Sequence, residues 1–341
     1  MKKIFYWSPH LSRVATIKNV INSAKSIKLF NKNEINVSII DAIGEWKKEK
    51  NQLQNSKINF IELPGLILSK FLPITGFFKT RIIFLLILIT KYPYLNKLLK
   101  KEKPEYLILH LVTILPLIIL LISNHKTKFI LRISGLPKVT FLRKILWKKV
   151  SNKLFLITCP SEQTKVDMIQ LGLFPEKKIK VLYDPILDVD LISEQLKKNY
   201  DLNIINKKYF LNIGRLTKQK NQALLIKAFV DLIKNYQDLY LYIVGDGEEK
   251  KTLEKIIENN NLKKNVFLLG DLENVYPLIK NSLAAVSTSI WEDPGAVMVE
   301  AAYCEKPVIS SNCPNGPREF LLHGNGGYLF KNNELENLKK N

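Results

Sequence analysis

The chain has 341 residues, of which 46% are hydrophobic and 24% charged, and its 52 Lys and Arg exceed its 31 Asp and Glu by 21. This composition excludes an intrinsically disordered chain, and the length favours two domains. The net charge comes almost entirely from lysine, which we interpret as a general enrichment of lysine along the whole chain. No nucleic-acid recognition module accompanies this charge, so nucleic acid is excluded as the expected partner.

The first half predicts strands that alternate with helices. A strand is expected at residues 3–8, a helix with apolar residues three or four apart at 14–30, and a second strand at 35–43. Further strands are predicted at 106–110, 128–134 and 154–160. Repeated strand–helix units build parallel sheets that are covered on both faces, so this half predicts a Rossmann-like domain.

Two apolar runs raise the question of a membrane span. Tyr106–Ser123 approaches the necessary length, but Pro116 interrupts it, and proline is common at the first position of a helix. We therefore expect a buried strand at Tyr106–His110 and a buried helix at Pro116–Ile122. The run Ile82–Ile89 is too short to cross a bilayer, so the sequence predicts no transmembrane helix.

The second half repeats the same scheme after an interruption near residue 185. Strands are predicted at 209–213, 240–244, 266–269, 284–287, 306–311 and 326–330. Helices are predicted at 222–235, 248–259, 275–281 and 296–303. The expected architecture is α/β with two Rossmann-like domains, 1–190 and 205–341, and ligands of such proteins bind at the carboxyl ends of the strands.

Neither cysteine nor histidine spacing indicates a metal site. The three cysteines (159, 304 and 313) form no CxxC pair, and the four histidines (10, 110, 125 and 323) are scattered. The opening "MKKIFYWSPHL" lacks the apolar core and cleavage site of a signal peptide. We therefore expect a reducing, cytoplasmic location.

Two glycine-containing turns of the second half follow predicted strands. The stretch "NIGRLTKQKN" places Gly214, Arg215 and Lys220 directly after a strand, where one Arg and one Lys suit the two charges of a diphosphate. The stretch "IVGDGEE" supplies Gly245 and Gly247 after the next strand. This second pattern is compatible with nucleotide binding and equally with an ordinary tight turn.

The stretch "SIWEDPGAVMVEAA" holds two glutamates eight residues apart. Pro294 and Gly295 begin a helix whose first free N–H groups would attract phosphate, and these include the amides of Ala296 and Val297. A carboxylate accepts two hydrogen bonds from a diol, so Glu300 suits a ribose and Glu292 suits sugar hydroxyls. The alternative is an ordinary acidic residue that favours the helix dipole.

Taken together, these motifs resemble the retaining family 4 glycosyltransferases of the GT-B fold. The family's Glu-x7-Glu signature is matched by Glu292 and Glu300, and "IGRLTKQK", "IVGDG", "KPVIS" and "GPRE" match further family motifs in order over residues 205–330. The resemblance implies a nucleotide-sugar donor, no metal and no cofactor. It also implies that the sugar is transferred with retention of configuration.

The resemblance also assigns roles by position. Glu292, Arg215 and Lys220 would be catalytic, with Arg215 and Lys220 holding the diphosphate and stabilising the leaving group. The implied donor-binding residues are Gly214, Arg215, Lys220, Gly245, Gly270, Glu292, Gly295, Ala296, Val297 and Glu300. Of these, Glu300 would bind the ribose, and the turn at Gly270 would lie near a nucleobase, for which uracil is expected.

The first half departs from the family pattern. Its first loop, "SPHLSRVA", lacks the usual glycine pair and offers Arg13, and "FILRISGLPK" offers Arg132, Ser134 and Gly135 where many relatives have a histidine. His110 is either a substitute for that histidine or a structural residue. These five residues are the candidate donor or acceptor contacts of this half.

The motif "NCPNGPREFL" resembles relatives that transfer hexoses or N-acetylhexosamines in polysaccharide or lipid-linked oligosaccharide assembly. The expected partners are therefore a UDP-linked sugar and a glycan or polyprenyl-linked acceptor. Contact with an anionic membrane surface is also expected, through Gly65–Leu72 and Phe77–Ile89, at the inner face of the plasma membrane. Family members usually continue beyond the last predicted strand, so we expect the C-terminal helices to be truncated.

Two other functions remain open at this point. One is a nucleotide-sugar epimerase on the same fold, which would release no acceptor-linked product. The other is a non-catalytic protein that binds a nucleotide sugar without turnover.

Overall fold

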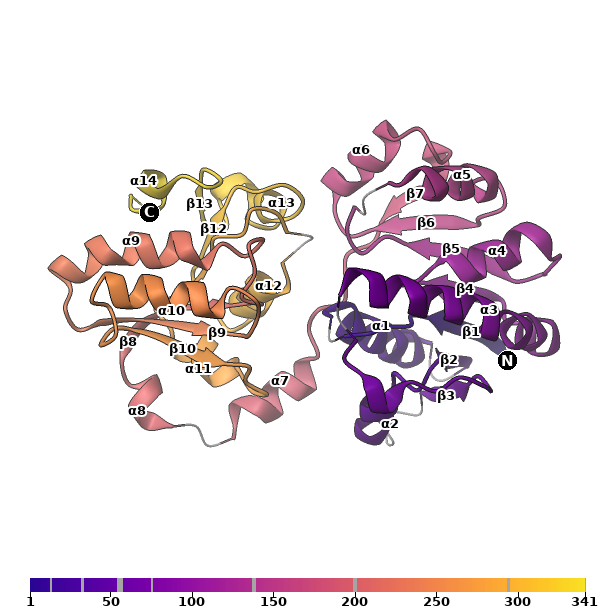
Figure 1. Cartoon of the computed structure of the whole chain (residues 1–341), viewed down its shortest axis with the longest axis horizontal. Coiled ribbons are helices and arrows are strands. Elements are labelled where there is room, and N and C mark those ends of the chain that lie inside the picture. The colour runs from indigo at the N-terminus through magenta and orange to yellow at the C-terminus, as the bar shows by residue number, and fades with distance from the viewer. Residues whose placement is uncertain are drawn as a thin grey trace. The chain divides into compact units, whose positions relative to one another are not determined.

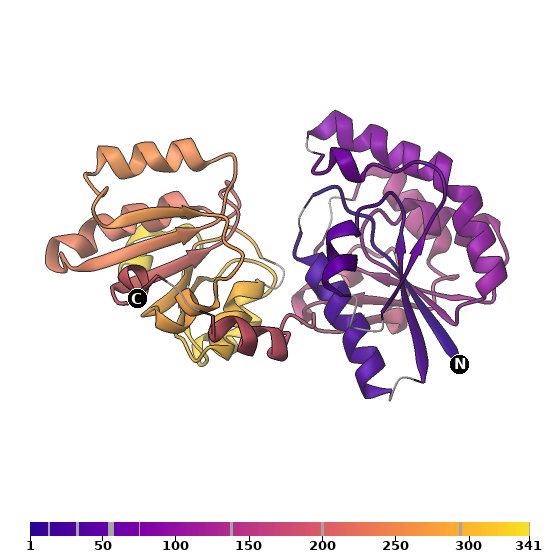
Figure 2. The ribbon, with the colours of Figure 1, turned by 90° about the horizontal axis from the view of Figure 1, so that it is seen from below.

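The chain consists of two compact units, each built around an open parallel sheet. The computed structural model describes residues 1–12, 14–31, 34–53, 58–74, 76–136, 139–198, 201–292 and 295–340. The units are Met1–Pro185 and Ile186–Asn341. Helices cover both faces of each sheet (Figures 1 and 2). The predicted α/β class with two parallel sheets is confirmed.

The first unit has a seven-stranded sheet in the order β3-β2-β1-β4-β5-β6-β7. Its strands are β1 (Lys2–Trp7), β2 (Ile35–Asp41), β3 (Asn59–Glu62), β4 (Tyr106–Leu109), β5 (Lys128–Arg132), β6 (Leu156–Cys159) and β7 (Ile179–Val181). Its helices are α1 (Thr16–Phe30), α2 (Lys47–Gln52), α3 (Phe77–Glu102), α4 (Ile114–Ile122), α5 (Phe141–Val150) and α6 (Glu162–Gln170), with short 3-10 turns η2 (Ser69–Phe71) and η3 (Glu176–Lys178).

Both faces of this sheet are buried, which is why its strands are continuous apolar runs. On one face Tyr6 and Ile39 pack against Val20 of α1. On the other face Trp7 and Leu107 belong to a core that α3, α4, α5 and α6 complete. The strands predicted at 3–8, 35–43, 106–110, 128–134 and 154–160 are all present, with ends that differ from the prediction by at most two residues.

Helix α3 differs from the sequence-based expectation. The run Ile82–Ile89 belongs to a 26-residue helix, so the prediction of a short apolar segment was wrong about its length. In the described part of the chain, Phe78–Glu102 alone is long and apolar enough to cross a membrane by those two criteria. It nevertheless packs on the sheet through Ile87, Leu95 and Leu99, which are all fully buried. The predicted helix after Pro116 is present and begins two residues earlier, at Ile114.

The second unit has a six-stranded parallel sheet in the order β10-β9-β8-β11-β12-β13. Its strands are β8 (Lys208–Ile213), β9 (Leu239–Val244), β10 (Val266–Gly270), β11 (Ala284–Ser287), β12 (Val308–Ser311) and β13 (Tyr328–Phe330). Its helices are α7 (Val189–Leu196), α8 (Leu202–Ile205), α9 (Gln222–Asn235), α10 (Lys250–Asn259), α11 (Tyr276–Asn281), α12 (Ala296–Tyr303), α13 (Pro317–Phe320) and α14 (Leu335–Leu338), with a 3-10 turn η4 (Leu322–Gly324).

Two cores sandwich this second sheet. One lies under α9, α10 and α14 and contains Phe229, Leu241 and Leu253. The other lies under α7, α11 and α12 and contains Ile192 and Leu278. Helix α7 therefore belongs to the second unit, although it precedes the first strand of that unit by a dozen residues.

The loops at the carboxyl ends of β8, β9 and β10 are held against one another by their glycines. Gly214 N–H donates to the Val244 carbonyl (2.9 Å), and Gly245 N–H donates to the Gly270 carbonyl (2.7 Å). Gly245 has φ +135°, and a Cβ placed on it would lie 2.1 Å from the Gly214 carbonyl oxygen. The close approach of these two loops therefore requires glycine at position 245.

We expect Gly245→Ala to lower the free energy of unfolding by about 3 kcal/mol, because the methyl group collides with backbone and the positive φ adds strain. Urea unfolding of the full chain, followed by circular dichroism, measures this loss. Gly270→Ala is the matched control, since Gly270 also has a positive φ (+73°) but open space around its Cβ position. The control is expected to lose about 1 kcal/mol, and equal losses in the two variants would contradict the explanation.

Candidate functional site

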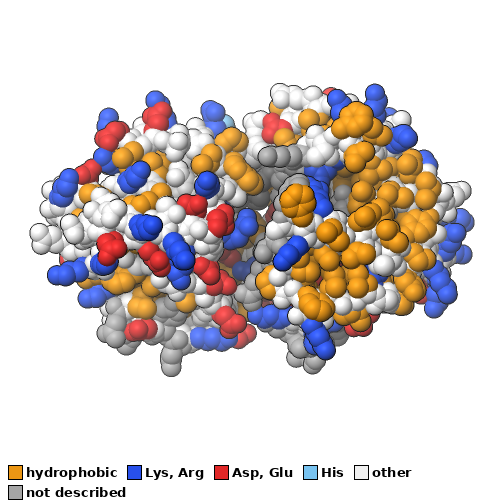
Figure 3. Space-filling view, in the orientation of Figure 1, with side chains coloured by type: hydrophobic (Ala, Val, Ile, Leu, Met, Phe, Trp, Pro, Cys, Tyr) orange, Lys and Arg blue, Asp and Glu red, His pale blue; other side chains and the backbone are white. Residues whose placement is uncertain are grey.

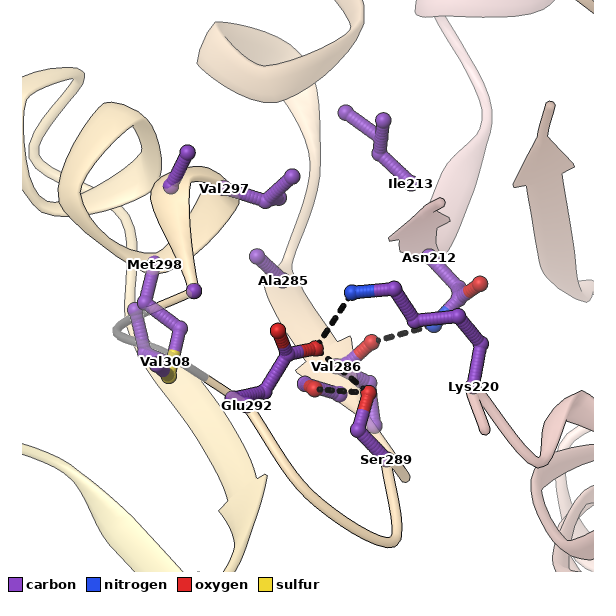
Figure 4. Close-up of a pocket in the computed structure, with 13 residues that line it drawn as sticks. Asn212, Ile213, Lys220, Ala285, Val286, Ser289, Glu292, Val297, Met298 and Val308 are labelled. Atoms are coloured by element: carbon purple, nitrogen blue, oxygen red, sulfur yellow. Dashed lines mark hydrogen bonds and ion pairs between the residues drawn. The ribbon is translucent and has the colours of Figure 1, made fainter. Parts of the chain in front are cut away.

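A pocket lies at the carboxyl ends of β8 and β11 in the second unit (Figure 4). Its walls come from these two strands, the loops that follow them, the start of α12 and the first residue of β12. The lining residues are Asn212, Ile213, Lys220, Ala285, Val286, Ser287, Ser289, Glu292, Gly295, Ala296, Val297, Met298 and Val308. This is the position at which parallel α/β sheets bind ligands.

The polar centre of the pocket is an ion pair between Lys220 and Glu292. Lys220 Nζ lies 2.5 Å from Glu292 Oε1. The same carboxylate oxygen accepts a hydrogen bond from Ser289 Oγ at 2.6 Å. The second oxygen of Glu292 takes part in neither contact and is turned away from both partners (Figure 4). The Glu292 side chain is only 9% exposed, so its charge is held in a largely dehydrated place.

Hydrogen bonds between two loops position this pair of side chains. Thr288 Oγ1 donates to the carbonyls of Lys220 (3.1 Å) and Asn221 (3.0 Å). In the same region Ile290 N–H donates to the Gln219 carbonyl at 2.8 Å. The loop after β8 is thereby tied to the loop after β11, and Lys220 faces Glu292 although 72 residues separate them in sequence.

The start of α12 forms another wall. Gly295 precedes the helix with φ +91°, a conformation that favours glycine, and a Cβ there would lie 2.5 Å from Met298 Cε. The amides of Ala296 and Val297 belong to the first turn, where no carbonyl lies one turn earlier to accept their hydrogen bonds. The predicted helix 296–303 is confirmed, whereas Pro294, predicted to start it, lies outside the described residues.

Glu300 lies one turn further along α12, outside the pocket lining. Its side chain is buried, and its Oε1 accepts a hydrogen bond from the Tyr276 hydroxyl at 3.2 Å. Burial, followed by the nearby charge of Glu300, raises the pKa of Tyr276 above its ordinary value, so the tyrosine remains a hydrogen-bond donor. The carboxylate of Glu300 is thus oriented by a neutral partner from α11.

The remaining predicted donor residues lie outside the pocket lining: Gly214 and Arg215 follow β8, Gly245 follows β9, and Gly270 ends β10. Arg215 is exposed, and in the described part of the chain its guanidinium has no hydrogen-bond or ion-pair partner. Its backbone carbonyl is held by Gln222 Nε2 at 3.1 Å. The backbone is therefore anchored while the cationic end of the side chain extends into solvent.

The candidates from the first unit have different surroundings. Arg132 is buried in an ion pair with Asp184 and donates to the Leu182 carbonyl at 2.5 Å.

His110 is buried, and its Nδ1 has no hydrogen-bond partner among the described residues. Burial and the charge of Arg132 lower the pKa of His110 to about 3, so its ring is neutral. Ser134 and Gly135 are half-buried in the turn after β5. Arg13 lies outside the described residues.

Among the pocket residues that the sequence analysis did not predict, Ser289 and Asn212 make polar contacts. Ser289 holds the carboxylate of Glu292, and Asn212 lies in β8 with its Nδ2 donating to the Val286 carbonyl at 2.8 Å. The Oδ1 atom of Asn212 is buried and has no partner among the described residues. A polar residue inside the apolar strand "KYFLNI" is the signal that could have indicated Asn212, because such residues need a specific partner.

The arrangement combines two recognition chemistries in one place. Lys220, the nearby Arg215 and the first-turn amides of α12 suit a phosphate group. Glu292, Ser289 and Asn212 supply hydrogen-bonding oxygens of the kind that bind sugar hydroxyls. A ligand with both an anionic and a polyhydroxyl part matches this set of residues.

Comparison with known proteins shows what this region is similar to. Residues 195–341 match the family model described as Glycosyl transferases group 1. The chain is 34% identical over 246 residues to an uncharacterized glycosyltransferase of Methanocaldococcus jannaschii, which covers 66% of this chain and 60% of that protein. It is 29% identical over 216 residues to an N-acetylgalactosaminyltransferase of Campylobacter jejuni that acts on a diphospho-undecaprenol-linked saccharide, covering 61% of this chain and 57% of the relative. The chain thus spans less than two thirds of the length of these relatives.

Solved structures show the same fold. A glycosyltransferase from Rickettsia africae superposes with a TM-score of 0.72 at 19% identity, over 99% of this chain and 86% of that chain. The Anabaena protein HepE in complex with UDP-glucose superposes with a TM-score of 0.70 at 20% identity, over 100% and 88% of the two chains. The chain therefore has the GT-B fold, and residues 195–341 are similar in sequence to the glycosyl transferases group 1.

Proposed function

We propose that this protein is a retaining glycosyltransferase of family 4 that moves a hexose or N-acetylhexosamine from a UDP-linked donor to a polysaccharide or lipid-linked oligosaccharide. The observation that carries the proposal is the meeting of Lys220, Glu292 and the first turn of α12 in one pocket of the family domain.

Lys220 and Arg215 are the proposed partners of the donor diphosphate. Lys220 Nζ already lies in the pocket, and Arg215 extends from the same loop without a described partner. The N–H groups of Ala296 and Val297 supply further hydrogen bonds to phosphate, and the helix dipole adds a favourable potential. These cations and amides neutralise the diphosphate, so we expect the protein to need no metal ion and no cofactor.

Glu292 and Glu300 are the proposed partners of the two sugars of the donor. The oxygen of Glu292 that contacts neither Lys220 nor Ser289 can accept hydrogen bonds from the hydroxyls of the transferred sugar. Glu300, oriented by Tyr276, would accept from the ribose hydroxyls. Gly245 and Gly270 bring the loops after β9 and β10 beside this region, where the uracil base would lie.

In the proposed reaction the bond between the anomeric carbon and the diphosphate oxygen breaks, and UDP leaves with the electron pair. The acceptor hydroxyl oxygen bonds to the same carbon, and its proton passes to a diphosphate oxygen of the leaving UDP. Lys220 and Arg215 stabilise the charge that develops on that leaving group. Glu292 holds the sugar ring in a fixed orientation, which lowers the entropic part of the barrier.

The relatives support this choice of substrates. HepE has been crystallised with UDP-glucose, and two Campylobacter jejuni relatives are transferases that act on undecaprenol-linked glycans. The family match favours transfer over epimerisation or binding alone. A cytoplasmic location, peripheral to the inner face of the plasma membrane, is part of the proposal.

We expect the full-length protein to bind UDP in isothermal titration calorimetry and Arg215→Ala to bind it roughly 10- to 100-fold more weakly, since a charge-assisted contact to phosphate is lost. Lys218→Ala is the matched control, because it removes an exposed cation from the same loop and is expected to leave the affinity unchanged. Absence of UDP binding by the folded wild-type protein, or equal weakening in both variants, would contradict the donor site.

We expect Glu292→Gln to reduce hydrolysis of a UDP-sugar at least about 100-fold, because the sugar loses its orienting carboxylate. The affinity for UDP alone should stay the same or increase, because Lys220 is released from its ion pair and becomes available to the diphosphate. Glu254→Gln, an exposed carboxylate on α10, is the control and should retain full activity. Parallel loss of UDP affinity and hydrolysis in Glu292→Gln would show that Glu292 acts on the nucleotide or on the fold.

A further inference from the structure

The outer side of α3 is apolar, although it faces solvent. Phe78, Ile82, Leu85 and Ile89 recur at three- or four-residue spacing and are 80%, 59%, 55% and 63% exposed. The opposite side of the same helix is buried in the core of the first unit. An apolar face opposite a buried one indicates that something other than water covers it.

This surface continues onto neighbouring elements. Phe141 and Leu142, at the start of α5, are each 77% exposed, and Phe71 in η2 is 70% exposed. Helix α4 packs against both α3 and α5, and Figure 3 shows hydrophobic side chains gathered over the helices of this unit with Lys and Arg among them. We call this surface the apolar face. It comprises Ile67, Phe71, Phe78, Ile82, Leu85, Leu86, Ile89, Phe141, Leu142 and Ile145.

Helices α3 and α5 each carry one arginine, Arg81 and Arg143. Arg81 is exposed, and Arg143 lies with its guanidinium carbon 5.7 Å from the centre of the Trp147 ring. Burial, followed by the like charge of Arg81, lowers the pKa of Arg143. Guanidinium groups beside an apolar surface suit phosphate groups.

The net charge is concentrated in the same segment, contrary to the even distribution inferred from composition. Residues 63–161 contain 17 Lys and Arg but only two acidic residues, Glu102 and Glu105, so these 99 residues carry 15 of the 21 net positive charges. The apolar face and all its supporting helices lie within this segment. Such a combination of exposed aromatic and aliphatic side chains with surrounding cations is typical of membrane-surface elements.

We propose that the apolar face is a membrane-contact surface that lies in the headgroup region of an anionic lipid bilayer. Helix α3 would lie along the bilayer surface and not cross it, because Leu95 and Leu99 are held in the protein core. A second copy of the chain is the less suitable occupant. A two-fold interface would bring this strongly cationic segment against itself and oppose like charges.

The test is flotation of the full chain with phosphatidylcholine vesicles, with and without an equal part of phosphatidylglycerol. We expect binding to the anionic vesicles that weakens as salt rises, because the cations are screened. Ile82→Gln with Leu85→Gln should lower the partition coefficient at least about tenfold. Lys148→Gln with Lys149→Gln should lower it roughly 25-fold on anionic vesicles only.

The matched control is Leu29→Gln with Phe30→Gln at the end of α1. These two side chains are 75% and 82% exposed, and α1 covers the opposite face of the sheet from α3 (Figure 2), so binding should not change. Thermal unfolding of every variant verifies the fold. Three results would each overturn the proposal: no flotation of the wild type, equal binding by all variants, or a wild-type dimer in light scattering that the α3 variant converts to monomer.

Discussion

The ion pair between Lys220 and Glu292 is the contact on which the candidate site depends. It joins the loop after β8 to the loop after β11, and the side chains of Ser289 and Thr288 support it. A charge pair with little solvent exposure needs both partners and their hydrogen bonds in place, since either charge alone would be costly to bury. The pair therefore keeps a cation and a carboxylate side by side at the start of α12.

This arrangement also explains how one pocket serves two kinds of ligand group. The lysine and the first-turn amides of Ala296 and Val297 favour negative charge, whereas the carboxylate favours hydroxyl donors. In the proposed function, a diphosphate would compete for Lys220 and release Glu292 to accept from sugar hydroxyls. This geometry would couple recognition of the nucleotide to recognition of the sugar, and Gly295 leaves room for the Met298 side chain at the start of α12.

Much of the fold could be predicted from the sequence, because apolar runs and helical spacing are local properties. Five of the seven strands of the first sheet, the six strands of the second sheet and the helix at 296–303 followed from them, whereas β3 and β7 were not predicted. The pairing of Lys220 with Glu292 could not, because it joins residues 72 positions apart. For the same reason, the sequence could not predict that Tyr276 donates a hydrogen bond to Glu300 or that Arg132 pairs with Asp184. The length of α3 was missed because its polar second half looks unlike its apolar first half.

The central claim is that the donor binds at the carboxyl ends of β8 and β11, and amide hydrogen exchange tests it most directly. Exchange rates of the full chain would be compared with and without UDP. The account predicts slower exchange at the loop 214–220 and at the first turn of α12, with little change in α10 or in the outer side of α3. Protection confined to other segments, or no protection at saturating UDP, would contradict it.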